Sequence, residues 1–154
     1  MVKINLTKGL HCVISEMDFE FVNKHKWHAH ESRGKFYAAS FIDKERILMH
    51  RFIMGIHGIK GMFVDHINGD GLDNQRENLR LSTLCQNQHN RKLNSNSKTG
   101  FKGVTVSGNK YLAQIKINGQ AKRLGRFSDP NIAAMAYNKA AVEIYGEFAR
   151  LNQI

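Results

Sequence analysis

Two turn signals in the C-terminal third of the chain constrain its fold more than any other feature. Ser107-Gly108-Asn109 and Asn118-Gly119 separate three runs of strand-like residues, at 101–106, 110–117 and 121–127. Such Gly and Asn pairs favour the tight turns that join antiparallel strands. The sequence therefore predicts a three-stranded antiparallel sheet. In its middle strand, alternation places Ala113 and Ile115 on one face and Gln114 and Lys116 on the other.

One helix is predicted after the third strand. Asp129 is a favourable N-cap, Pro130 suits the first helical turn, and Gly146 is typical of a helix end. A stripe of apolar residues follows one side of this helix, at Ile132, Ala136, Ala140 and Ile144. We expect this stripe to cover the apolar face of the sheet.

A small polar stretch without apolar periodicity, residues 94–100, separates this part from the rest of the chain. The N-terminal piece is too small to bury a core of its own, so we assign it to the same domain as the residues that follow it. The expected fold is α+β. The expected domains are 1–94, with 1–45 as a β-rich N-terminal extension and 46–94 as the core, a linker at 95–99, and a second domain at 100–154.

Charge and cysteine usage indicate the class of partner. The chain of 154 residues has a formal net charge of +10, and seven basic residues but no acidic one lie between Lys98 and Arg126. Single-sign charge along predicted strands indicates a polyanionic partner. Cys12 and Cys85 are too far apart in sequence to suggest a metal pair or a disulfide framework. With no apolar run long enough to span a bilayer and no secretory start, we expect a soluble cytoplasmic protein.

The best candidates for catalytic and metal-binding side chains lie between residues 65 and 91. Asp65-His66 is followed by Asn78 and by Asn87-Gln88-His89-Asn90-Arg91. An imidazole that titrates near neutrality can act as a general base. An aspartate and an amide oxygen suit Mg²⁺, which favours oxygen ligands and keeps water for a substrate phosphate. Together they indicate metal-assisted hydrolysis of a phosphodiester.

These residues belong to a longer motif. It consists of Val64-Asp65-His66-Ile67-Asn68-Gly69-Asp70, followed by Asn78-Leu79-Arg80 and then by Asn87. This pattern resembles the HNH nuclease family, in particular its phage homing-endonuclease branch. The resemblance implies a ββα-metal core that holds one divalent ion, Mg²⁺ or Mn²⁺. It implies that His66 is the general base, that Asp65 and Asn87 hold the metal, and that Asn78 braces the loop. Asn87 replaces the family's last His, which implies modest metal affinity without DNA. His89 is an alternative last residue, less favoured by its spacing.

Two flanking segments add candidates. His50-Arg51, within a short helix or strand-to-helix passage, resembles the pair that opens the homing-branch module. The resemblance implies that His50 orients the site and Arg51 touches phosphate, although a structural histidine is an equal alternative. Thr83 and Gln86 match a capping box, which predicts a helix from Leu84. That helix would place Asn87, Asn90 and Arg91 on one face, with Arg91 contacting DNA.

The C-terminal part has its own resemblance. Its motifs are Gly103-Val104, Ala113-Gln114-Ile115, Leu124-Gly125-Arg126-Phe127, Ala133-Ala134-Met135-Ala136-Tyr137-Asn138 and Arg150-Leu151-Asn152. In order and spacing they resemble the plant ethylene-response-factor domain of Apetala-two type, over residues 99–153. The resemblance implies that the sheet face opposite the helix enters the DNA major groove. Thr105, Ser107 and Ala121 replace usual arginines, so base specificity is not implied. The candidate DNA-binding residues are Lys102, Thr105, Ser107, Lys110, Gln114, Lys116, Lys122 and Arg123.

Weaker interpretations remain as alternatives. The segment from His66 to Glu77 partly mimics a calcium-binding loop, but an aspartate is missing at its first position. The histidines around Trp27, namely His25, His28 and His30, could form a metal cluster but have no fixed acidic or cysteine partner. A transcription regulator with an inactive HNH scaffold and a structural RNA-binding protein are the rival functions.

The sequence therefore predicts a site-directed, metal-dependent DNA endonuclease of the HNH homing type. Its partner would be double-stranded DNA rather than a small molecule or a membrane. A single Asp65-His66-Asn87 constellation supplies one base and one metal, so we expect a monomer on DNA that nicks one strand.

Overall fold

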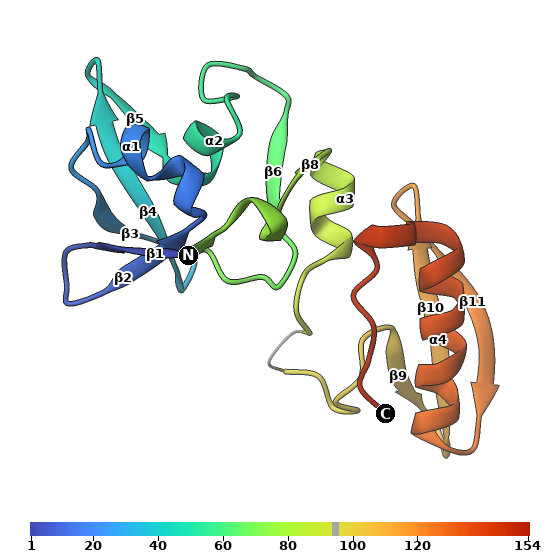
Figure 1. Ribbon diagram of the computed structural model, residues 1–154. Coiled ribbons are helices and arrows are strands. Elements are labelled where there is room, and N and C mark those ends of the chain that lie inside the picture. The colour runs from blue at the N-terminus through green and yellow to red at the C-terminus, as the bar shows by residue number, and fades with distance from the viewer. Residues whose placement is uncertain (94–95) are drawn as a thin grey trace. The chain divides into compact units, whose positions relative to one another are not determined.

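Small sheets and short helices, rather than one large sheet, organise the computed structural model, which describes residues 1–93 and 96–154 (Figure 1). The described chain divides into two units, Met1–Asn87 and Gln88–Ile154. The predicted linker at 95–99 begins at a residue outside the described part, and residues 96–99 contain no helix or strand. The α+β fold class is confirmed.

The first unit contains three small sheets. One has the order β1-β2-β7, the second the order β3-β4-β5, and the third pairs β6 with β8. The strands are β1 (Val2–Asn5), β2 (His11–Ile14), β3 (His28–Ser32), β4 (Lys35–Ile42), β5 (Glu45–Leu48), β6 (Phe63–His66), β7 (Asp73–Asn74) and β8 (Leu79–Ser82). The helices are η1 (Glu16–Asp18), α1 (Phe19–Val22), α2 (Met49–Ile53), η2 (Arg76–Asn78) and α3 (Leu84–His89), the last of which continues into the second unit.

The N-terminal extension shares one core with the residues that follow it. Ile14 and Trp27 are buried in the same cluster as Met49, Val64 and Leu79. The Trp27 indole N–H donates to the Val22 carbonyl over 2.8 Å, which satisfies the polar atom of this buried ring. The strand β2 also pairs in parallel with β7, the short strand inside the loop that follows β6. The extension therefore helps to hold that loop in place.

An ion pair fastens the same loop from a second direction. Arg76 in η2 donates to Asp18 at 2.8 Å, and the Asp18 side chain is fully buried. The Arg76 backbone N–H also donates to the Ser15 hydroxyl over 2.9 Å. Both contacts join residues about sixty positions apart in sequence, so η2 is fixed against the extension.

The second unit has the three predicted strands and the predicted helix. Its sheet has the order β11-β10-β9, formed by β9 (Val104–Ser107), β10 (Lys110–Ile117) and β11 (Gln120–Phe127). The helix α4 (Pro130–Tyr145) begins at the Asp129 cap, whose carboxylate accepts from the backbone N–H groups of Asn131 and Ile132. Gly146 ends α4 with a φ of 55°, and η3 (Gly146–Phe148) follows.

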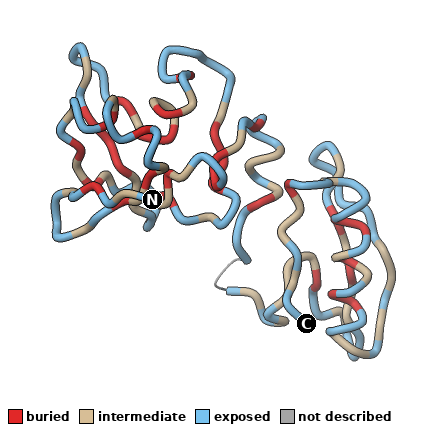
Figure 2. Tube along the Cα trace, viewed as in Figure 1, coloured by how far each residue is buried: buried red, intermediate tan, exposed pale blue. Residues whose placement is uncertain are grey.

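The predicted contact face of α4 is only partly right, because Ala136 and Ala140 pack in the core but Ile132 and Ile144 do not. The helix buries Ala133, Ala134, Tyr137, Ala140 and Ala141, whereas Ile132 and Ile144 are exposed. Figure 2 shows buried and exposed stretches alternating along this helix. The alanines let α4 approach the buried strand residues Val104, Ala113 and Ile115 closely. Tyr137 covers Gly103, where any Cβ would overlap the tyrosine ring. The side of α4 that packs on the sheet is therefore determined by the close approach that its alanines allow and by the Tyr137 ring. The number of branched apolar side chains on a side of the helix does not determine it.

Candidate active site

The strand β6 carries both Asp65 and His66 at its end. It pairs with β8 so that Asp65 lies opposite Arg80 and His66 lies opposite Leu79. Only 5% of Asp65 and 7% of His66 are exposed, although both side chains are polar. Burying such groups costs free energy unless they are bonded. Their position is thus determined by the sheet and by specific partners.

His66 is surrounded by three other side chains. Its Nε2 lies 3.4 Å from Asn74 Oδ1, its ring meets the His50 ring edge-on with centroids 4.8 Å apart, and the Tyr37 ring centroid lies at 6.1 Å. Burial lowers the pKa of His66, while the Asn74 hydrogen bond and the nearby charge of Asp65 partly oppose that shift. The imidazole is therefore neutral at neutral pH, which is the form that can accept a proton.

Asp65 is engaged by a buried arginine. Arg80 donates to Asp65 Oδ2 from Nε at 3.0 Å and from an Nη at 2.7 Å. The Arg80 side chain is 12% exposed. Charged hydrogen bonds of this length are among the stronger ones in proteins. The carboxylate is consequently held in one orientation.

Asn78 ties the two ends of the loop together. Its Nδ2 donates to Asn68 Oδ1 at 3.1 Å and to the Asp73 carbonyl at 2.8 Å, and its Oδ1 accepts from the Asn68 backbone N–H at 2.9 Å. Asp70 Oδ1 accepts from the Leu72 N–H. Since these side chains bond to one another and to the loop backbone, the geometry favours a braced loop over a calcium-binding one.

His50 lies inside the site, whereas Arg51 points to the protein backbone. His50 is 6% exposed, its Nδ1 has no hydrogen-bond partner among the described residues, and burial together with His66 and Arg51 lowers its pKa to about 3. The Arg51 guanidinium donates to the carbonyls of Ile56, Ile59 and Met62 at 2.6 to 2.7 Å. This side chain therefore closes the turn after α2, and its expected phosphate contact stays a prediction.

The capping box is confirmed, but the helix it starts is shorter than expected. The Thr83 N–H donates to Gln86 Oε1 and the Gln86 N–H donates to Thr83 Oγ1. The half-buried Asn87 lies within α3, while Asn90 and Arg91 follow its end, so the predicted shared face is wrong. The Lys102 ammonium donates to the carbonyls of His89 and Arg91, and so binds the backbone at the helix end.

The expected metal ligands come from two elements of the first unit. Asp65 lies on β6 and Asn87 lies on α3, which follows β8 directly. Within the described residues, no group of three or more His, Cys, Asp or Glu side chains gathers as a metal site. A carboxylate oriented by Arg80 and an amide oxygen fit a hard divalent ion that takes its other ligands from phosphate and water.

Three residues of the site were not predicted from the sequence. Arg80 faces Asp65 across the β6–β8 pair, Asn74 bonds to His66, and Tyr37 on β4 contacts the rings of His50 and His66. Tyr37 also packs on Gly71, where a Cβ would overlap the tyrosine ring and the Phe36 carbonyl. Strand pairing could have located Arg80. No sequence signal connects Tyr37 to a loop about thirty residues away.

The strand register in the second unit defines the face opposite α4. Thr105 lies opposite Leu112 and Gln114 lies opposite Arg123, on the side away from the buried Ala113 and Ile115. Ser107, Lys110 and Lys116 fall on this same side by alternation. Lys122 pairs with Ile115 on the helix side of the sheet, away from the other candidates, so its expected DNA contact stays a prediction that the register does not favour.

Arg126 was missed by sequence reasoning. It pairs with Leu112 and is exposed on the same face as Arg123. A β-bulge between Ala113 and Gln114 shifts the register at Leu124, which changes the alternation along β11. Strict alternation of side chains along β11, counted from Arg123, would place Arg126 on the side of the sheet that faces the helix.

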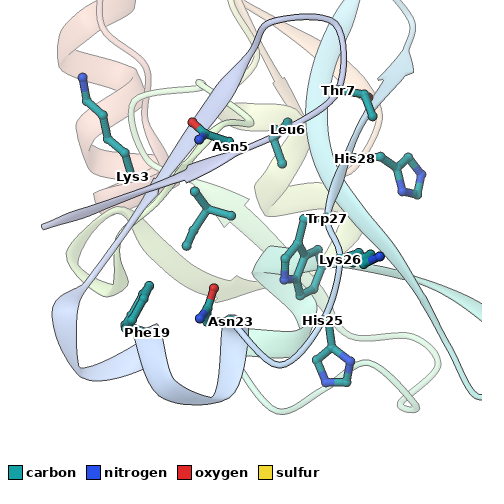
Figure 3. Close-up of a pocket in the computed structure, with 11 residues that line it drawn as sticks. Lys3, Asn5, Leu6, Thr7, Phe19, Asn23, His25, Lys26, Trp27 and His28 are labelled. Atoms are coloured by element: carbon teal, nitrogen blue, oxygen red, sulfur yellow. The ribbon is translucent and has the colours of Figure 1, made fainter.

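A pocket of about 640 Å³ lies elsewhere in the first unit (Figure 3). Its lining includes His25 and His28 of the alternative histidine cluster, together with Lys3, Lys26 and Trp27. None of the predicted catalytic or metal-binding residues lines it. This pocket and the candidate active site around Asp65 and His66 therefore lie in different parts of the first unit.

A family model and one relative name the same family. Residues 49–89 match the model of a family described as HNH endonuclease. The chain is 35% identical over 152 residues to the uncharacterized HNH endonuclease L560 of Acanthamoeba polyphaga mimivirus, covering 96% of this chain and 77% of that protein. It is 28% identical over 92 residues to Protein 3.8 of Escherichia phage T7, covering 59% of this chain and 76% of that protein. No solved structure matches the chain. None of the helices in the described residues has the length and hydrophobicity needed to cross a bilayer.

Proposed function

The chain belongs to the HNH endonuclease family, and we propose that it is a metal-dependent DNA endonuclease in which His66 is the general base. The observation that carries this proposal is the buried, neutral imidazole of His66 next to Asp65, whose carboxylate is bonded to Arg80, inside the segment that matches the family model. A neutral imidazole can take a proton from a water molecule as that water attacks phosphorus.

Each neighbouring residue has a proposed role in this reaction. Asp65 and Asn87 would hold Mg²⁺ or Mn²⁺, which would neutralise charge on the phosphate and the leaving oxygen. Arg80 keeps the Asp65 carboxylate oriented. Asn78 holds the loop after His66 in shape through its bonds to Asn68 and Asp73. His50 packs against the base as a neutral ring, because its pKa is about 3.

We further propose that the second unit binds duplex DNA through the sheet face opposite α4. This face carries Lys110, Lys116, Arg123 and Arg126, and pairs Gln114 with Arg123. The basic side chains would neutralise phosphates, and Gln114 and Arg123 are suited to base edges. A DNA-binding unit joined to a single catalytic constellation fits a site-directed homing enzyme that nicks one strand as a monomer. The regulator alternative is less favoured, since Asp65, His66 and Asn87 are all present.

Cleavage of supercoiled plasmid with Mg²⁺ or Mn²⁺, and with chelator instead, tests the proposal. His66→Ala should reduce the cleavage rate by roughly two to four powers of ten, because the base is lost. The matched control is His30→Ala, which removes a half-buried histidine on β3 in the same unit. If His66→Ala cut plasmid at the parental rate under matched metal, His66 would not be the base.

A further inference from the structure

The side chain of Asn74 is fully buried, and its amide oxygen lies next to His66, the proposed base. Its Oδ1 lies 3.4 Å from His66 Nε2, while its Nδ2 has no hydrogen-bond partner among the described residues. Burying an amide costs free energy, and leaving its Nδ2 unbonded raises that cost. A packing role alone would be served better by an apolar side chain of the same size. The hydrogen bond to His66 therefore explains why an amide, rather than an apolar side chain, occupies position 74.

The backbone around Asn74 is fixed independently of its side chain. Asn74 lies opposite the fully buried Ile14 in the parallel pairing of β7 with β2. One residue earlier, the Asp73 carbonyl accepts from Asn78 Nδ2 at 2.8 Å. The Oδ1 atom is thus presented to His66 from a rigid support. Such support is what keeps catalytic geometry precise.

The ring of His66 is also restrained from two sides. His50 meets it edge-on at 4.8 Å and Tyr37 lies at 6.1 Å. A neutral imidazole carries its proton on one nitrogen and its lone pair on the other, and the partner of one nitrogen decides which form is present. Catalytic hydrogen bonds are often long before substrate binds, so a separation of 3.4 Å is compatible with this control.

We propose that Asn74 is the positioning residue that sets the tautomer of His66: Asn74 Oδ1 accepts from Nε2–H, so that Nδ1 is the basic nitrogen. This inference rests on the proposed function for its catalytic meaning. The tautomer itself is a property of the protein without DNA or metal. Asn74 acts through His66 and contacts neither substrate nor metal in this role.

The direct test is a long-range ¹H–¹⁵N NMR spectrum of the metal-free, full-length protein at about pH 8, above the ordinary pKa of histidine. The spectrum of His66→Gln identifies the His66 ring signals by their loss. We expect wild-type His66 to carry its proton on Nε2. Asn74→Leu, which keeps the size but removes the acceptor, should change the His66 signals towards a mixture of both tautomers. Asn74→Asp keeps an acceptor and should preserve Nε2–H.

Plasmid cleavage then gives the catalytic readout. Asn74→Leu should lower kcat by about tenfold to a hundredfold, as losing an orienting hydrogen bond does in comparable sites, with KM unchanged. Asn74→Asp should retain most of kcat. Asn23→Leu is the matched control, because Asn23 is exposed and lies outside the catalytic loop. Circular dichroism and DNA affinity in chelator show whether each variant is folded.

The outcomes separate this inference from the proposed function. Wild-type His66 protonated on Nδ1, or a folded Asn74→Leu whose tautomer and kcat equal the wild type, would overturn the role of Asn74. An Nε2–H tautomer that depends on Asn74, in a protein that cleaves no DNA with any divalent ion, would support the pairing and overturn the proposed function.

Discussion

Arg80 donates twice to the same oxygen of Asp65, across the β6–β8 pair, and both side chains are largely removed from solvent. Arg80→Met removes the cation that compensates a buried carboxylate. Breaking such a pair costs about 3 to 5 kcal/mol. We therefore expect a loss of that order in the free energy of unfolding, measured by urea denaturation in chelator.

An exposed ion pair provides the control for that experiment. Lys8 and Glu31 lie 3.7 Å apart with more than half of each side chain exposed. Lys8→Met should therefore change the free energy of unfolding by less than about 1 kcal/mol. If Asp65 binds Mg²⁺, added Mg²⁺ should restore stability to Arg80→Met more than to wild type. Equal losses in the two variants would contradict the structural role of Arg80.

Stability should fall as the pH is lowered from 7 to 5, partly because of His50. The folded-state pKa of His50 is about 3, below the ordinary value of 6.5, so the unfolded chain takes up this proton first. Each pH unit between these values costs about 1.4 kcal/mol, which gives about 2 kcal/mol at pH 5. Urea denaturation across this range should show a smaller fall in His50→Leu. Identical pH profiles would show that His50 is solvated in the folded protein.

The rate of cleavage should fall at acid pH, because protonation removes the basic form of His66. Burial lowers the pKa of His66 from 6.5, so the neutral form persists below the pH at which a free histidine is protonated. We expect the acidic limb of the kcat profile, at saturating metal, to lie below pH 6.5. His30→Ala should show the same limb, since it leaves the site unchanged. An acidic limb above pH 7 would contradict the buried, neutral state described for His66.

Gly103 is expected to be intolerant of any side chain. Its φ is +75°, and a Cβ would overlap the Tyr137 ring. Gly103→Ala should therefore lower the thermal unfolding temperature of the second unit, by strain and by displacing Tyr137 from the core. Gly108→Ala is the control, with a φ of +64° but open space around the new Cβ. The difference between the two variants measures the overlap, and equal effects would rule it out.

The two faces of β11 should differ in DNA binding. Arg123→Ala and Arg126→Ala should weaken binding to duplex DNA and, where the side chain reaches phosphate, flatten its salt dependence by about one unit. Lys122→Ala removes the same charge from the helix side and should have a smaller effect. Gel-shift titrations at several salt concentrations check this. A loss for Lys122→Ala that matches Arg126→Ala would contradict the assigned face.

Local signals predicted much of the second unit, because hairpin turns and helix caps act over a few residues. The Asp129 cap and the three strands follow from such signals, as does the Thr83 capping box in the first unit. The face of α4 did not, since a close approach to Gly103 cannot be inferred from apolar spacing.

In the first unit, the motif located Asp65, His66 and Asn78 as candidates, and the structure shows the contacts of each. It could not locate Tyr37 or Asn74 as neighbours of His66, because their approach depends on β4 and on the parallel β2–β7 pairing. Parallel pairing joins segments that are distant in sequence, so it leaves no local pattern to read.

The end of α3 determines where the second unit begins along the chain. The His89 ring stacks on Tyr145 with centroids 3.7 Å apart, and Lys102 bonds to the His89 carbonyl, so the last residue of α3 is built into the second unit. A cut in the polar stretch at 94–100 would remove this stacking partner from Tyr145. A fragment that keeps the contact would begin at Gln88, one residue after Asn87, and would carry the last two residues of α3 with it.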